Sequence, residues 1–121
     1  MLGWYFVVYP QTVHATGLNE KDHRLASWEV GLNGAQWIKD LCKIGEAVDL
    51  GGNGYPNRYV LTAAALRRAL QHGVPKHDSP PVIGDDYFLP GGWIGKVELD
   101  RERLNGLAPQ TLLAVEVWDQ S

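Results

Sequence analysis

The chain has almost no cysteine. Cys42 is the only one among 121 residues, which excludes an intramolecular disulfide framework and a zinc site built from CxxC pairs. A single cysteine fits a reducing compartment, and we expect a cytoplasmic protein. Because Cys42 follows Leu41 in a helical pattern, we interpret it as a buried, inert thiol rather than a nucleophile.

Long hydrophobic runs are missing as well. The apolar start of the chain, residues 2–9, ends at Pro10 after about one strand's length. It also lacks the positive segment and the small-residue cleavage site of a signal peptide. We therefore expect no membrane-spanning segment and no membrane partner.

Positive charge is in deficit. The chain carries 11 Lys and Arg against 14 Asp and Glu, and its formal net charge is −3. Phosphate binding normally shows as an excess of Lys and Arg, so this balance argues against nucleic acid and leaves basic protein partners open. The composition, 45% hydrophobic and 21% charged, is ordinary for a globular protein of this length. We assign residues 1–121 to a single domain.

Signatures of catalysis are also absent. The glycine-rich segment 51–58 lacks the lysine of a nucleotide P-loop, and Asn57 stands where a GxGxxG fingerprint needs its third glycine. Neither an HExxH helix nor a GxSxG elbow occurs. We favour a non-enzymatic protein and expect no catalytic residue, no metal and no other cofactor.

What is present is a mixture of strand and helix signals. Aromatic and β-branched runs predict strands at residues 4–9, 27–32, 46–50 and 111–118. We place the first near the middle of the sheet and expect the last to pair inside it. A hairpin is expected between residues 87–89 and 93–99, across the turn-forming residues 90–92.

Two stretches repeat apolar residues at helical spacing. Residues 33–45 begin with a capping-box spacing at Asn33. Residues 62–73 run from Thr62, a good N-cap, to Gly73, which can close the last turn in a left-handed conformation. These stretches predict the two main helices.

The elements together predict an α+β fold. We expect a single sheet, mixed or antiparallel and of about four to six strands, with two main helices packed on it. The glycine-rich turn 51–58 is expected to lead directly into the second helix. Asp100 is expected to cap one brief helical turn.

Recognition of another protein is the function that the residues favour. Aromatic, acidic and basic side chains gather at predicted turns and edges, next to a rigid proline-rich connection over residues 74–86. The predicted contact residues are Tyr55, Arg58, Tyr59, Asp85, Asp86, Tyr87, Phe88 and Trp93. We interpret the chain as a bacterial or phage inhibitor or immunity-type protein that neutralises a partner enzyme. A homodimer formed through the edge strand 87–89 stays open.

A small enzyme or ligand-binding domain is the alternative. Its pocket would lie between the 51–58 turn and the 74–90 loop. The residues expected to line it are Gly52, Asn53, Gly54, His72 and His77. Residue types and spacing alone do not decide between the two readings.

Overall fold

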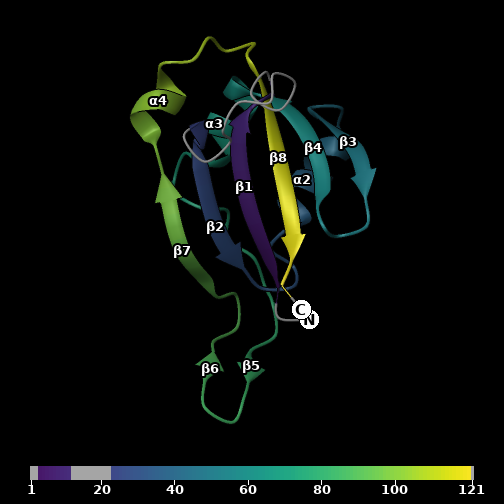
Figure 1. The fold of residues 1–121 in the computed structure, drawn as a ribbon, viewed down its shortest axis with the longest axis vertical. Helices are drawn as coiled ribbons and strands as arrows, with labels where there is room; N and C mark the ends of the chain where they lie inside the picture. The colour runs from purple at the N-terminus through teal and green to yellow at the C-terminus, as the bar shows by residue number, and fades with distance from the viewer. Residues whose placement is uncertain (1–2, 12–22, 121) are drawn as a thin grey trace.

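The computed structural model describes residues 3–11 and 23–120 of the chain. Along these segments, short helices stand between groups of one to three strands (Figure 1). The elements are β1 Trp4–Pro10, β2 Ala26–Val30, α2 Gln36–Lys43, β3 Ala47–Gly52, β4 Asn57–Thr62, α3 Ala63–Ala69, β5 Val82–Ile83, β6 Phe88–Leu89, β7 Ile94–Leu99, α4 Arg101–Asn105 and β8 Leu112–Asp119.

Six strands form one sheet in the order β3-β4-β8-β1-β2-β7, and each neighbouring pair is antiparallel. β1 and β8, which come from opposite ends of the chain, pair at its centre. Four consecutive residues of β1, from Phe6 to Tyr9, are buried, which suits the nearly continuous apolar sequence of this central strand. The α+β prediction is therefore confirmed in outline, as are the central β1 and the internal β8. A second sheet of two strands, β5 and β6, was not expected.

The main sheet buries one face against helices. Side chains alternate along each strand, so Phe6 and Val8 of β1 and Val115 of β8 share the face that meets Ile38 of α2 and Leu66 of α3. All five are fully buried. Figure 1 shows α2 and α3 behind the sheet. The two main helices thus pack on one face, as predicted.

The opposite face of the sheet carries a smaller apolar cluster. Val7 and Tyr9 of β1 are its buried members, and Tyr5 and Ala114 pack against them. We call this surface the open face, because the helices α2, α3 and α4 do not pack on it in the described structure. It is the second surface on which a binding site can be built.

The predicted caps have mixed outcomes. The Thr62 hydroxyl accepts a hydrogen bond from the Ala65 amide at 3.1 Å, which confirms the N-cap of α3, although this helix ends at Ala69 instead of continuing to Gly73. The predicted cap Asn33 is wrong, because α2 starts at Gln36 without any side-chain cap. Asn33 is engaged elsewhere, in contacts described below.

The cap predicted at Asp100 is confirmed. Its carboxylate accepts a hydrogen bond from the Arg103 amide at 3.1 Å, at the start of α4. None of the helices in the described segments is long and apolar enough to cross a membrane.

The glycine-rich turn does not lead directly into a helix. It closes the β3–β4 hairpin, and the six residues of β4 separate it from α3. The alternation in β4 explains the strand, since Tyr59 and Leu61 are buried against the helices whereas Arg58 projects from the other face. An anion site formed jointly by this turn and the α3 N-terminus is therefore excluded.

The late hairpin is also different from the prediction. Residues 87–89 do not pair with 93–99; β6 pairs with β5, while β7 pairs with β2 at the edge of the main sheet. A tight turn at Asp85 and Asp86 closes the short hairpin more directly than the loop 90–92 would. β7 meanwhile pairs with five-residue β2, a longer ladder than two-residue β6 offers.

Candidate protein-binding site

Residues 80–90 form an arm that carries β5 and β6 beyond the end of the main sheet (Figure 1). Ile83 and Phe88 are Cα partners in this hairpin, so their side chains lie on the same face. Ile83 is 78% exposed and Phe88 is 62% exposed. Among the large apolar side chains of the described residues, Ile83 has the highest exposed fraction. The arm therefore presents an apolar pair to solvent.

The tip of the arm adds negative charge to this apolar pair. Asp85 and Asp86 form the turn and are both exposed. Neither carboxylate makes an ion pair or hydrogen bond with another residue in the described ranges. The Gly84 amide donates to the Tyr87 carbonyl at 2.9 Å, and the Tyr87 ring lies against Gly84, where a Cβ would collide with it. The tip is thus compact, and both acids are free to meet a partner.

The base of the arm is fastened to the sheet by hydrogen bonds around Ser79. The Ser79 hydroxyl accepts from the Asn33 amide at 2.9 Å, and the Asn33 side chain donates to the Asp78 carbonyl at 2.5 Å. The Ser79 carbonyl accepts from the Gly92 amide at 3.0 Å. Because Asn33 follows β2 while Gly92 precedes β7, these bonds tie both ends of the arm to the main sheet.

His77 completes this base. Its Nδ1 lies 2.7 Å from the Ser79 hydroxyl and its Nε2 lies 3.2 Å from the Trp93 carbonyl. A carbonyl can only accept, so Nε2 carries a proton, and in the neutral ring Nδ1 then accepts from the hydroxyl. We call this set of His77, Ser79, Asn33 and Trp93 the clamp. Both nitrogens of His77 are occupied in it, so neither is open to a metal ion in this arrangement.

Glycines allow the clamp to close tightly. A Cβ on Gly92 would lie 2.6 Å from the His77 carbonyl, and one on Gly31 would lie 2.7 Å from the Ser79 Cβ. Gly92 also has a φ of +69°, a conformation that other residues rarely adopt. These two glycines therefore let the backbone after β2 approach Ser79, and the backbone before β7 approach His77, more closely than a residue with a Cβ would permit.

The structure separates the other predicted contact residues. Tyr55 is 55% exposed in the β3–β4 turn. In Figure 1 the connection between β3 and β4 lies at the same end of the sheet as the arm. Trp93 is half-buried at the clamp. Arg58 projects from the open face and pairs with Glu116 at 3.2 Å, whereas Tyr59 is only 4% exposed within the core. Tyr59 is too deeply buried to contact a partner. Four of the predicted contact residues do lie together on the arm: Asp85, Asp86, Tyr87 and Phe88.

The residues of the alternative ligand site do not converge. The amides of the glycine-rich turn are taken up locally: Gly54 donates to the Asn57 side chain at 2.9 Å, and Tyr55 donates to the Asn53 side chain at 3.0 Å. None of the main cavities among the described residues is lined by both the 51–58 turn and the 74–90 loop. His72 borders a cavity beyond α3, and His77 borders another beside α2.

Metal and thiol chemistry find little support either. Across residues 3–11 and 23–120, no group of three or more His, Cys, Asp and Glu side chains is arranged to hold a metal ion. Burial raises the pKa of the Cys42 thiol, and the nearby negative charge of Asp49 raises it further. A raised pKa keeps the thiol protonated at neutral pH, which is the opposite of what a nucleophile requires.

Sequence reasoning missed three residues of this site. Ile83 supplies the most exposed apolar side chain, Ser79 organises the clamp, and Asn33 was assigned to a helix cap. A signal for the arm was present in VIGDDYFL, where two short β-prone pairs flank a Gly-Asp-Asp turn. No local signal reveals the part that Asn33 plays in the clamp, because its two hydrogen-bond partners, Ser79 and Asp78, lie 46 and 45 positions along the chain.

Comparison of the chain with protein-family models, curated proteins and solved structures gives no match.

Proposed function

We propose that this chain is a small non-enzymatic module that binds another protein, and that the arm is the element inserted into the partner. The observation that carries the proposal is the exposed Ile83 and Phe88 pair on a hairpin with a fastened base. An exposed apolar patch with a polar rim is characteristic of a contact surface.

The energetics favour the arm as an anchor. An exposed fraction of 62% leaves about 120 Å² of the Phe88 side chain to be buried, and burying it stabilises a complex by about 3 kcal/mol. This magnitude is that of an interface hot spot. Because the clamp already orders the base of the arm, binding loses less conformational entropy than it would with a loose loop.

The charge of the tip indicates the chemistry of the partner. Asp85 and Asp86 stand beside the apolar pair, and no residue in the described segments neutralises them. The complementary surface is an apolar cleft with Lys or Arg at its rim. The concrete form we propose is an inhibitor or immunity-type protein that neutralises a basic enzyme in the cytoplasm.

Capture from a lysate of the source organism tests this function. The immobilised full chain should retain one stoichiometric protein, and the double variant Ile83→Ser, Phe88→Ser should lose it. The matched control is Val48→Ser, Leu50→Ser on β3, where the two side chains are 56% and 57% exposed. Circular dichroism melting checks that both variants fold.

Two results would contradict the proposal. One is the absence of any stoichiometric partner, and the other is equal retention by the arm variant and the control. Once a partner is identified, Asp85→Asn with Asp86→Asn should mainly slow association and weaken its salt dependence, because rim charges act chiefly on the association rate.

A further inference from the structure

The open face of the sheet carries a groove that is independent of the arm. Its cavity of about 460 Å³ is lined by Tyr5, Val7, Arg24, Glu116, Trp118 and Gln120. We call it the Arg24 groove, because two adjoining cavities of about 480 and 710 Å³ also border Arg24. Its volume lies in the range of small-molecule sites.

Aromatic rings form one wall of the Arg24 groove. Tyr5 of β1 and Trp118 of β8 are Cα partners in neighbouring central strands, so both side chains project from the open face. Trp118 is 36% exposed. Val7, two residues after Tyr5 in β1, is buried and also lines the cavity. A flat apolar group can stack here.

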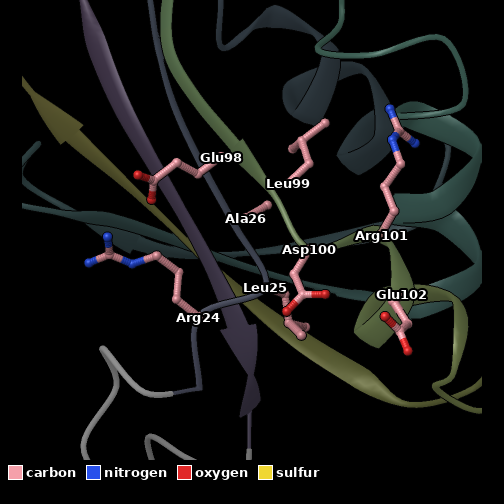
Figure 2. A pocket seen from close by; sticks show the side chains of 8 residues that line it. All are labelled: Arg24, Leu25, Ala26, Glu98, Leu99, Asp100, Arg101 and Glu102. Carbon is pink, nitrogen blue, oxygen red and sulfur yellow. The ribbon is translucent and has the colours of Figure 1, made fainter.

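Arg24 supplies a positive charge that forms no ion pair with any carboxylate in residues 3–11 and 23–120. Its Nη1 donates to the Tyr5 hydroxyl over 3.3 Å, and its buried Nε has no hydrogen-bond partner among the described residues. Figure 2 shows its guanidinium extending away from Asp100, Arg101 and Glu102, whereas Glu98, the fourth other charged residue of the 710 Å³ cavity, lies on the same side as Arg24. A half-buried guanidinium of this kind is completed best by a carboxylate, which can accept two parallel hydrogen bonds.

The acids near the Arg24 groove limit the ligand's charge. Glu116 is neutralised by Arg58 at 3.2 Å, and Glu29 is neutralised by Lys96 at 3.1 Å. Glu98 has no such partner among the described residues, and in Figure 2 its carboxylate lies on the same side of the sheet as the Arg24 guanidinium. A ligand carboxylate can therefore pair directly with the Arg24 guanidinium, whereas Glu98 would repel a second negative charge on the ligand.

We propose that the Arg24 groove binds a small aryl monocarboxylate, with its ring on Tyr5 and Trp118 and its carboxylate on Arg24. The site lies on the open face and uses no residue of the arm. The test of ligand binding is therefore independent of the test of partner binding.

A titration of the full chain followed by amide NMR tests the proposal, with phenylacetate as the probe and neutral phenylacetamide as its isostere. Phenylacetate should give saturable shifts at residues 5, 24, 118 and 120, and phenylacetamide should bind at least tenfold more weakly. Equal shifts for both probes, or no saturation with phenylacetate at millimolar concentration, would overturn it.

Substitutions sharpen this test. Arg24→Gln should weaken phenylacetate binding roughly tenfold or more, whereas Arg68→Gln, which removes an arginine paired with Glu46 outside the groove, should not change it. Glu98→Gln should strengthen binding, because it removes a repulsive charge. An unchanged affinity in Arg24→Gln refutes the assignment, and if that variant does not fold, the comparison of the two probes on the unmodified chain decides.

Discussion

Ser79→Ala is the substitution that tests the clamp most directly. It removes one hydroxyl that accepts from the Asn33 amide at 2.9 Å and shares a hydrogen bond of 2.7 Å with His77 Nδ1. Ser79 is 7% exposed, so water does not easily replace the lost partner. Leaving a buried donor or acceptor unsatisfied costs about 1–3 kcal/mol. Because Asn33 and His77 are only part-buried, we expect the total loss to stay within that range, about 1–3 kcal/mol.

Two measurements separate a loosened arm from general damage. Urea unfolding gives the free energy of unfolding, and amide hydrogen exchange reports local opening. Protection should fall at the amides of Asn33 and Gly92, which donate to the Ser79 hydroxyl and carbonyl. Protection in the central strands β1 and β8 should fall only as far as the global stability does.

Ser27→Ala is the matched control. Ser27 is also buried, at 2% exposed, but no residue in the described structure forms a hydrogen bond with its hydroxyl. We expect a change within about 0.5 kcal/mol for this control. The clamp would be refuted if Ser79→Ala were as mild as Ser27→Ala and left the Gly92 amide fully protected.

Three other substitutions follow from particular contacts. Gly92→Ala should destabilise the protein by about 1–3 kcal/mol in urea unfolding, because it combines a backbone clash with a φ of +69°, whereas Gly95→Ala, with a nearest contact of 3.7 Å, should be mild. Arg67→Ala should cost about 1.5–3 kcal/mol, since Nη1 donates to three backbone carbonyls at and just after the end of α4. Iodoacetamide should label Cys42 slowly at neutral pH, and Asp49→Asn should speed labelling by removing a charge that raises the thiol pKa; unchanged labelling would contradict the electrostatic contribution.

The raised pKa values also set the sign of an alkaline effect on stability. Burial and Asp49 raise the pKa of Cys42 above 9.0 and that of Tyr59 above 10.0. A raised folded-state pKa means that the folded protein holds these protons more tightly than the unfolded chain does. Their contribution to stability is complete below about pH 9 and is lost as the pH rises through the folded values.

Local signals explain what could be predicted from the sequence. The strands β1 and β8 are dense apolar runs, and the caps Thr62 and Asp100 satisfy amides only three residues away. Such features depend on neighbours in the chain, so a sequence pattern contains them. β4 belongs to the same class, because its alternation was readable, although the glycines before it and the helix after it obscured the strand.

Long-range competition explains what could not be predicted. Asn33 has the spacing of a helix cap, yet the clamp offers its amide and side chain partners that lie 46 and 45 positions along the chain. Those tertiary bonds replace the local cap, and α2 consequently starts without one. The groove around Arg24 is equally invisible in the sequence, since it joins residues from both ends of the chain.

The arm is attached to the fold without supporting it. No residue between 80 and 90 belongs to the hydrophobic core, and the six-stranded sheet is complete without β5 and β6. Yet its base is held by several hydrogen bonds and by close approaches at Gly31 and Gly92. The residues of the arm itself contribute nothing to the core cluster. Exposed apolar side chains on a hairpin that is held at its base but lies outside the core are explained if they are buried in a complex. There the apolar pair and the two acids, which form no ion pair with the described residues, would find partners.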